Sequence, residues 1–168
     1  LFAACCGGKG DCVPETAVPV SEVSQLGPDT CTGKDLLCAP KAFLDPAAKP
    51  AACVAPGNVE ARCLPSCLPP VQAMKANLIQ GTCAADELCS PCYNPLNGTD
   101  TGACEINGDT PAKPKTIYPG CCPYPLSGGA TRGTCVPSVL VPTTEASILP
   151  QDSCSADYLC APNLKAND

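Results

Sequence analysis

The chain has 168 residues and a net charge of −6, and it contains 17 cysteines but no histidine. This cysteine content is typical of disulfide scaffolds in oxidising compartments, and the lack of histidine excludes serine–histidine and cysteine–histidine nucleophiles. The ten Lys and Arg residues are scattered singly, so no basic patch for nucleic acid or anionic lipid is predicted.

The composition also predicts a fold that depends on cross-links. There is no Trp, and with only two Phe and four Tyr a large aromatic core cannot form. Each disulfide contributes about 2–4 kcal/mol, which matters greatly to so small a core. We therefore predict small disulfide-rich tandem modules, mostly irregular, with short β-strands and one or two short helices. No catalytic residue, cofactor or metal site is predicted, and the longest apolar runs fall far below the roughly 20 residues of a membrane span.

The first predicted module covers residues 1–58 and opens with adjacent cysteines, Cys5 and Cys6. Neighbouring side chains of an extended segment point to opposite faces, so each is expected to reach a different partner. The sequence "GGKG" at 7–10 lacks the following Ser or Thr of a phosphate loop and is predicted to be a turn. In the loop from Cys12 to Cys31, "AVPV" at 17–20 is predicted to form a short extended edge strand.

The second predicted module covers residues 59–112, and "VAPGNVEAR" at 54–62 is expected to connect it to the first. A short helix is predicted over 70–79, where Val71, Met74 and Leu78 share one face. "AADELC" is expected to contain a turn, and "NPLNGTDTG" at 94–102 to form consecutive turns. The C-x-x-C spacing of Cys89 and Cys92 lacks a βαβ context, so structural disulfides are favoured over a redox site.

Oxygen-bearing side chains cluster in the same part of the sequence. A calcium site is one interpretation of them, but their spacing does not match an EF-hand loop, and turn chemistry explains them without an ion. The side chains concerned belong to Asn97, Asp100, Glu105, Asn107 and Asp109. Asn97 also begins an Asn-Gly-Thr sequon in a predicted exposed turn, which makes it a candidate glycosylation site.

The third predicted module covers residues 113–168, after a connector at 105–120, and again opens with adjacent cysteines, Cys121 and Cys122. Its loop from Cys135 to Cys154 has the same length as the loop from Cys12 to Cys31, and both run on into "LCAP". "VLVP" at 139–142 is predicted to be a second edge strand. The two loops are predicted to be repeats because they agree without a gap at Val13/Val136, Pro14/Pro137, Val18/Val141, Pro19/Pro142, Glu22/Glu145, Ser24/Ser147, Leu26/Leu149 and Asp29/Asp152.

The middle segment, "CLPSCLPP" followed by "QGTCAADELCSPCYNPLNGTDTGAC", resembles cysteine-rich repeats in predicted secreted surface proteins of myxobacteria and related bacteria. The resemblance implies an extracellular, cell-surface or matrix location and no catalytic role. It carries over only a cysteine framework, namely Cys63, Cys67, Cys83, Cys89, Cys92 and Cys104. The outer modules lack the C-x-x-C spacing, which leaves their pairing open.

The cysteine count is odd, so a fully paired monomer is impossible. Cys38 and Cys89 are each followed by another cysteine after fourteen residues, whereas Cys160 is not, so the third module is predicted to be incomplete at its C-terminal end. The complete predicted disulfide framework is Cys5, Cys6, Cys12, Cys31, Cys38, Cys53, Cys63, Cys67, Cys83, Cys89, Cys92, Cys104, Cys121, Cys122, Cys135, Cys154 and Cys160. Fifteen pairings are possible within a module of six cysteines, and the sequence selects none of them.

Two hypotheses account for the unmatched ends. In the first, the N-terminal segment of one subunit completes the third module of its neighbour, through a bond from Cys5 to Cys154 or Cys160, and so builds a filament. In the second, the chain is an excerpt of a longer array. The predicted function is accordingly a secreted structural subunit of an extracellular or cell-surface filament or matrix, which self-associates. The alternative is a binding module, of adhesin or protease-inhibitor type, that displays the two matched loops to a protein or cell-surface ligand.

Overall fold

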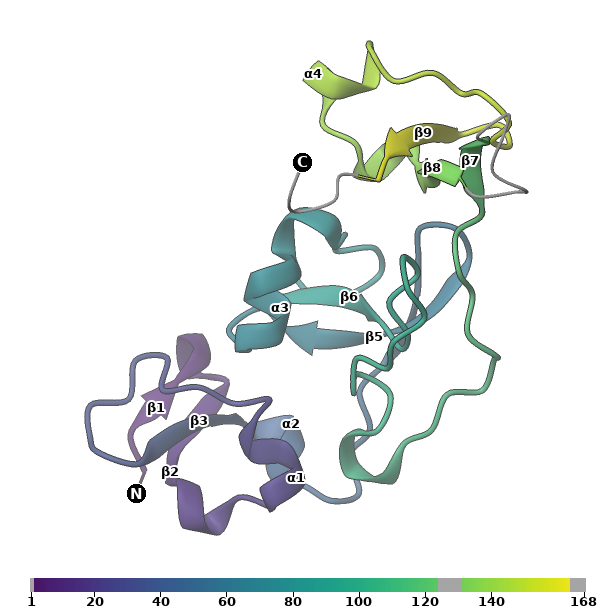
Figure 1. Cartoon of the computed structure of the whole chain (residues 1–168). Coiled ribbons are helices and arrows are strands. Elements are labelled where there is room, and N and C mark those ends of the chain that lie inside the picture. The colour runs from purple at the N-terminus through teal and green to yellow at the C-terminus, as the bar shows by residue number, and fades with distance from the viewer. Residues whose placement is uncertain (1, 124–130, 164–168) are drawn as a thin grey trace.

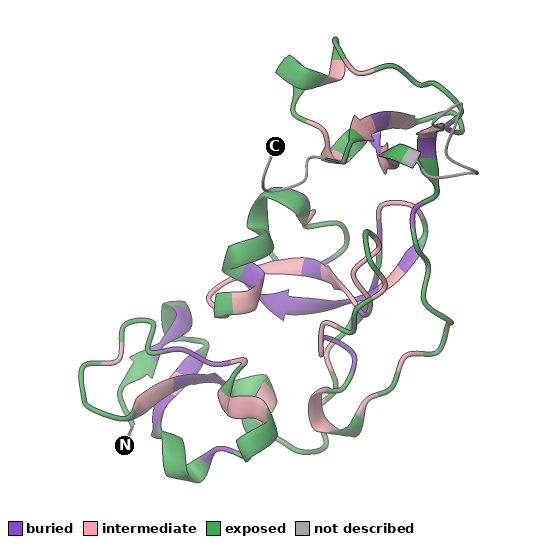
Figure 2. Ribbon diagram, viewed as in Figure 1, coloured by how far each residue is buried: buried purple, intermediate pink, exposed green. Residues whose placement is uncertain are grey.

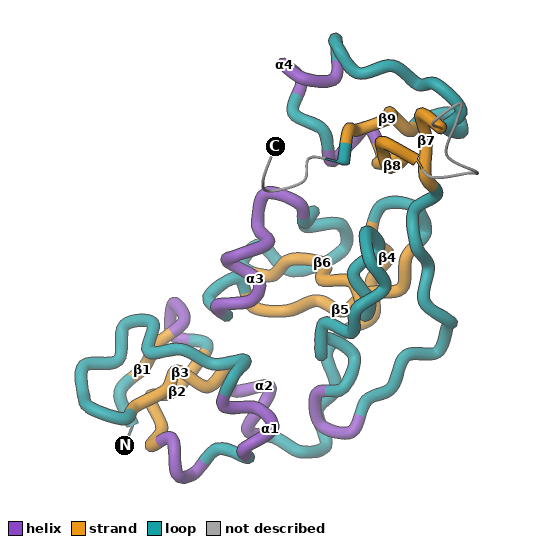
Figure 3. The backbone as a smooth tube through the Cα atoms, in the orientation of Figure 1, coloured by secondary structure: helices purple, strands orange, loops and turns teal. Residues whose placement is uncertain are grey.

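The computed structural model describes residues 2–123 and 131–163. Within these residues, short antiparallel strands form three separate three-stranded sheets, with strand orders β1-β2-β3, β4-β5-β6 and β7-β8-β9. Loops and turns make up most of the remaining chain (Figure 3). The predicted class, a small disulfide-rich protein with short strands and few short helices, is confirmed in this form.

The strands are β1 Ala4–Cys5, β2 Gly10–Pro14, β3 Leu36–Pro40, β4 Ala52–Ala55, β5 Val59–Pro65, β6 Glu87–Pro91, β7 Gly120–Pro123, β8 Thr131–Pro137 and β9 Tyr158–Pro162. The helical segments are α1 Val20–Val23, α2 Lys41–Leu44, α3 Pro69–Met74 and α4 Thr143–Ala146, with 3-10 turns η1 Cys6–Gly8, η2 Glu15–Ala17, η3 Lys75–Asn77, η4 Ile106–Gly108 and η5 Ser138–Leu140. Most strands end at a proline, which has no N–H group with which to extend the ladder.

The three sheets carry disulfides in corresponding places. One disulfide joins the first strand to the third, as Cys5–Cys38, Cys53–Cys89 and Cys121–Cys160. Another joins the middle strand to the loop that follows it, as Cys12–Cys31, Cys63–Cys83 and Cys135–Cys154. Two further bonds complete the set of eight: Cys92–Cys104 closes a loop after β6, and Cys6–Cys67 joins the first sheet to the segment after β5.

The sheets lie one after another along the molecule, with β1–β3 at the N-terminal end and β7–β9 at the other (Figure 1). Buried residues concentrate on the strands, whereas most turns and helical segments are exposed (Figure 2). A single apolar cluster spans the first two sheets. Its buried members are Val13, Val18, Leu26, Ala39, Leu64, Leu68, Val71 and Ala103.

The local predictions have mixed outcomes. The predicted helix at 70–79 is shorter, because α3 ends at Met74 and gives way to a 3-10 turn. Val71 is buried as expected. The predicted edge strands at 17–20 and 139–142 are not formed. Val18 and Val141 have extended backbone angles but belong to no strand, and the helical segments η2, α1 and η5 take up the other ends of these ranges. Prolines at the start of these turns fix a backbone angle that suits a helical turn as well as a strand.

The predicted turns at 94–102 are confirmed. Three side chains in succession bond the backbone N–H two residues ahead: Asn94 to Leu96, Asn97 to Thr99 and Asp100 to Gly102. Residues 54–62, expected to be a connector, instead form the β4–β5 hairpin, in which Ala55 pairs with Val59. The hairpin therefore crosses the expected boundary between residues 58 and 59.

Cys160 has a partner within the chain, although no cysteine follows it at the spacing seen after Cys38 and Cys89. Cys160 bonds Cys121, which precedes it in the chain, just as Cys38 bonds Cys5. A bond from Cys5 to Cys154 or Cys160 of a neighbour is likewise not formed, because all three sulfurs are already paired within the chain. The spacing of fourteen residues was misleading, because Cys53 belongs to the sheet that follows it rather than to the one before.

Candidate functional site

The unpaired cysteine is Cys122, on β7, the one free thiol in the described part of the chain, which contains every cysteine. Its neighbour Cys121 points into the third sheet and is fully buried. Cys122 is only half-buried. Its φ of 53° is not that of an extended strand, so the expected divergence of the two neighbouring side chains does not occur, and both sulfurs lie at Cys160. The site is therefore a thiol held at the edge of a disulfide-stapled sheet.

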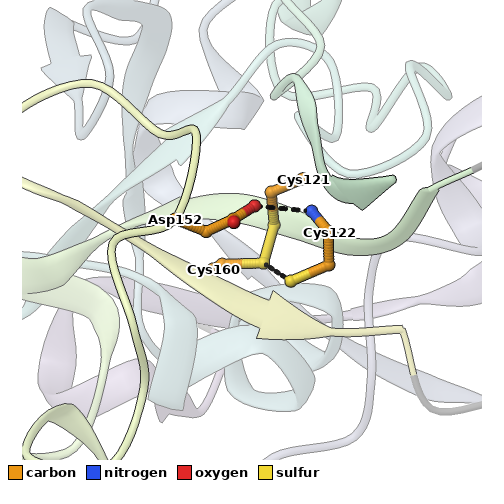
Figure 4. A group of neighbouring side chains, drawn as sticks. All are labelled: Cys121, Cys122, Asp152 and Cys160. Carbon is orange, nitrogen blue, oxygen red and sulfur yellow. Dashed lines mark hydrogen bonds between the residues drawn. A yellow bond between two sulfur atoms is a disulfide. The ribbon is translucent and has the colours of Figure 1, made fainter. Parts of the chain in front are cut away.

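Asp152 and Cys160 are the immediate neighbours of Cys122 (Figure 4). Its backbone N–H donates a hydrogen bond of 2.7 Å to Asp152 Oδ2. Its Sγ lies 2.9 Å from Sγ of Cys160, one end of the Cys121–Cys160 disulfide. Both Cys122 and Asp152 have positive φ angles, of 53° and 49°. This backbone conformation is costly for residues other than glycine, so the surrounding contacts must hold it in place.

The surroundings of Cys122 also hold back its reactivity. Partial burial raises the pKa of the Cys122 thiol, as do the negative charge of Asp152 and its hydrogen bond, while Arg132 acts in the opposite direction. The thiolate is the form that attacks disulfides and alkylating agents. A raised pKa keeps the thiol protonated near neutral pH and so slows its attack on the adjacent Cys121–Cys160 bond.

This account predicts the alkylation behaviour of Cys122. Native protein is expected to take up one equivalent of iodoacetamide per chain, more slowly at pH 7.5 than an unstructured cysteine does. The variant Asp152→Asn, which removes the charge but keeps a carbonyl acceptor, is expected to react severalfold faster. The matched control is Asp29→Asn, which should leave the alkylation rate of Cys122 unchanged, because Asp29 lies beside Cys6, whose sulfur is bonded. Equal rates for the wild type and Asp152→Asn would contradict this account; mass spectrometry over a pH series measures them.

The first sheet contains the same local structure in bonded form. The backbone N–H of Cys6 donates a 2.7 Å hydrogen bond to Asp29 Oδ2, and the φ angles of Cys6 and Asp29 are 53° and 44°. Here the thiol is used, because Cys6 is bonded to Cys67 across a Cα–Cα distance of 5.4 Å. Cys6 and Cys122 are thus two copies of one arrangement, one bonded and one free.

The second sheet lacks both parts of this arrangement. Val54 follows Cys53 at the position that Cys6 and Cys122 occupy in the other sheets. Gly81, with a φ of 55°, stands two residues before Cys83, where the other sheets have Asp29 and Asp152. The aspartate and the second cysteine therefore occur together or not at all.

Other contacts surround the Cys6–Cys67 disulfide at the junction of the first two sheets. Lys9, next to η1, forms an ion pair with Asp86, just before β6, but both side chains are exposed, so the pair adds little stability. Gly27 lies so close to α3 that a Cβ at this position would be 2.7 Å from Cγ of Pro69. Asn107 donates from Nδ2 to the carbonyls of Ala42, Asp45 and Ala48 and so fixes the linker between the sheets.

The residues considered for calcium lie apart in different roles. Asn97 and Asp100 accept the turn hydrogen bonds described above, Glu105 is exposed, and Asn107 binds the linker. Asp109 forms ion pairs with Arg62 and Lys49. Among the described residues, potential metal-binding groups gather mainly at disulfide sulfurs, which are not thiolate ligands, for example Cys121 and Cys160 beside Cys122 and Asp152. Asn97 of the sequon is exposed.

The C-x-x-C pair takes separate partners, since Cys89 bonds Cys53 and Cys92 bonds Cys104.

A further feature, not expected from the sequence, is an apolar cavity of about 380 Å³ beside α3. Its lining includes Phe43, Leu64, Met74, Leu78, Val136 and Leu140, which come from segments of all three sheets. Sequence reasoning missed it because residues so far apart in the chain give no local pattern.

Arg62 is the second feature that sequence reasoning missed. It is a buried charged residue on β5, paired with Glu60 on the same strand and with Asp109 on the connector. The i, i+2 spacing of Glu60 and Arg62, which places them on one face of a strand, was the available signal.

No protein-family model, curated protein or solved structure matches this chain. In the part of the chain that the structure describes, no helix has the length and apolar character needed to span a bilayer. The eight disulfides are consistent with an extracellular protein.

Proposed function

We propose that the chain is a secreted structural protein, a run of stapled modules that serves as a braced segment of an extracellular filament or matrix. The observation that carries this proposal is the Cys6–Cys67 disulfide, which joins one sheet to the next rather than stabilising either alone. A protein that only displays a loop needs bonds within its module. A protein that holds a fixed shape under load gains from bonds between modules.

In this proposal each module consists of one sheet, its two corresponding disulfides and the loop after its middle strand. Cys53 then belongs to the second module, and the first ends in the linker after β3. The apolar cluster shared by the first two sheets supports a packed junction, because its buried residues come from both modules. The eight disulfides support the extracellular setting.

The bracing role predicts the behaviour of a variant without the bond between modules. Cys6→Ser combined with Cys67→Ser removes that disulfide and leaves no new thiol. We expect each sheet to keep its own bonds, the radius of gyration to rise as the junction loosens, and the free energy of unfolding to fall by about 2–4 kcal/mol. Small-angle scattering and urea denaturation without reductant measure the two quantities.

The matched control is Cys122→Ser, which removes the corresponding thiol where no bond exists and should leave both quantities unchanged. A double variant as compact and as stable as the wild type would rule out a bracing role. Scattering also reports molecular mass. Growth of mass with concentration is expected if the chain self-associates, and a constant monomer mass would remove the self-assembling part of the proposal.

The alternative function is a binding module. The loops that follow Cys12 and Cys135 contain short helical turns, whereas an inhibitor loop of the usual kind is extended, so they do not favour that type. The apolar cavity is the observation that favours binding, because its volume lies in the range of small-molecule sites. A constant monomer mass together with an unaffected double variant would favour this alternative.

A further inference from the structure

The free thiol of Cys122 lies in a site that repeats the one around Cys6, except that its sulfur rests against Cys160 Sγ at 2.9 Å instead of forming a bond to the next module. The site matches the one around Cys6 in its neighbouring cysteine, in the aspartate that binds its N–H and in a φ of 53°. Around Cys6 this geometry accompanies a bond to the next module at Cys67. Asp152 accepts the N–H of Cys122 just as Asp29 accepts that of Cys6, although only Cys6 is bonded.

The acceptor position supports the same interpretation. Cys67 lies four residues after Cys63 on the second module, and the corresponding positions are Thr16 in the first module and Val139 in the third. The second module has Val54 in place of the donor cysteine, and the third module that follows it has Val139 in place of the acceptor. Donor and acceptor are thus present together at the first junction and absent together at the second. Cys122 is a donor with no acceptor in this chain.

The surface near Cys122 is also uncovered where its counterpart is covered. Val18 and Leu26 of the first module are buried in the cluster shared with the second module. Their counterparts Val141 and Leu149 are only half-buried.

Ile148, beside Leu149, is 77% exposed. In the first module the position of Ile148 is taken by Gln25, which packs against Gly102 beyond the second sheet. The residues around Ile148 therefore correspond to the face of the first module that the second module covers, at the junction where Cys6 bonds Cys67.

We propose that Cys122 forms a disulfide with a further module that carries a cysteine at the position of Cys67 and covers the surface formed by Val141, Ile148 and Leu149. This inference rests on the proposed modular function and names the partner of its third module. As the Sγ–Sγ bond forms, each of the two thiols loses one proton and one electron. A thiol oxidant of the disulfide class, such as glutathione disulfide, accepts them and becomes two thiols.

A second copy of this chain does not fit the partner so defined. Its Cys67 is already bonded to its own Cys6, and its remaining cysteines other than Cys122 are paired. A second copy therefore offers only a symmetric bond between two Cys122 residues. Such a bond involves no cysteine at the position of Cys67. The acceptor module must come with its cysteine unoccupied.

The test is a hybrid chain in which residues 1–162 are followed by a second copy of residues 41–112. The join preserves the local sequence, because residues 37–40 and 159–162 both read "LCAP", so the added copy follows the third module as the second follows the first. The hybrid is refolded in a glutathione redox buffer. We expect a bond between Cys122 and the added copy of Cys67, which mass spectrometry of peptides detects. Alkylation of Cys122 should drop about tenfold or more, because a bonded sulfur is not a nucleophile.

The control hybrid carries Cys67→Ser in the added copy only and should keep Cys122 as reactive as in the parent chain. The three other disulfides of the added copy, formed by Cys53, Cys63, Cys83, Cys89, Cys92 and Cys104, report that it has folded. If these three form while Cys122 stays free, binds glutathione or pairs with Cys122 of another molecule, the inference is overturned. It is equally overturned if the added copy folds only when its Cys67 is replaced.

The outcome is separable from that of the proposed function. Consider a hybrid chain that forms no bond at Cys122 while the Cys6→Ser/Cys67→Ser variant is less compact and less stable than the wild type. That pair of results would support the proposed array of linked modules and exclude only the partner inferred for Cys122. If the Cys6→Ser/Cys67→Ser variant is as compact and as stable as the wild type, the proposed function is wrong, whether or not the hybrid forms its bond.

Discussion

Reduction of the disulfides in otherwise native buffer is expected to unfold the chain, beginning with the third sheet. The buried cluster of that sheet consists of Cys121, Cys135, Cys154 and Cys160, with Cys122 and Tyr158 packed against it. Once the two bonds are reduced, almost no apolar side chain remains there to hold the strands together. Two bonds of about 2–4 kcal/mol each approach the whole stability of a small domain, roughly 5–15 kcal/mol.

The first two sheets should resist longer, because the cluster between them contains Val, Leu and Ala side chains. Hydrogen exchange measured by mass spectrometry at increasing phosphine reductant should show loss of protection in β7–β9 before β2 and β5. Treatment with a metal chelator is the control and should change nothing, since sulfur here stabilises through covalent bonds. A reduced chain that keeps the exchange pattern of the native protein would show that the apolar contacts suffice alone.

The sequence predicted the class of fold because composition decides it. A chain with 17 cysteines, 21 prolines and no Trp can bury little without staples, and prolines limit the length of its strands. The agreement of the loops after Cys12 and Cys135 also holds in space, since both begin with a 3-10 turn after the same proline. Their helical turns were mistaken for strands because valine alternation and proline occur in both structures.

The site was less predictable, because pairing depends on contacts across the chain. Counting residues after Cys38 and Cys89 suggested that Cys160 had lost a partner, whereas strand pairing brings it to Cys121. The features that mark Cys122 are the adjacent cysteine and Asp152, and both are visible in the sequence. Their meaning is not visible there, because only the structure shows that Asp29 and Asp152 bind the N–H groups of Cys6 and Cys122.

Arg62 offers the second large effect, because it ties the connector between the last two sheets to β5. Its Nε donates to Asp109 Oδ2 at 2.6 Å, and its Nη1 donates to Glu60 Oε1 at 3.1 Å. Glu60 in turn accepts the backbone N–H groups of Ala112 and Lys113. The connector then runs on towards β7 along the side of the molecule (Figure 1), and Tyr118 near its end donates to the carbonyl of Pro56 at the β4–β5 turn.

Hydrogen bonds in this network, with smaller effects of charge, lower the pKa values of both carboxyl groups. The backbone hydrogen bond from Ala112 is the main cause for Glu60, against an opposing effect of burial, and the Arg62 side chain is the main cause for Asp109. A lowered pKa in the folded state means that the stabilisation is present above the pKa of the unfolded chain and is lost as the pH falls through that of the folded chain. The ordinary values of 3.8 and 4.5 place this loss below about pH 4.

Replacement of Arg62 by Met should therefore be costly at neutral pH and less costly in acid. At pH 7 the variant leaves Glu60 and Asp109, both half-buried, without Arg62, and only the exposed Lys49 stays near Asp109. Breaking a fully buried pair costs about 3–5 kcal/mol, so the loss here should lie at or below the lower end of that range. At pH 3, below the ordinary pKa values of both groups, the carboxyl groups of the unfolded chain are largely neutral, so part of this stabilisation is lost and the difference from the wild type should shrink. Urea denaturation without reductant at both values measures it, with Lys49→Met as the control, because Lys49 is exposed and stands 3.8 Å from Asp109. That control should cost less than about 1 kcal/mol. A loss for Arg62→Met that is equal at the two pH values would mean that packing of the side chain, and not its charge, holds the connector.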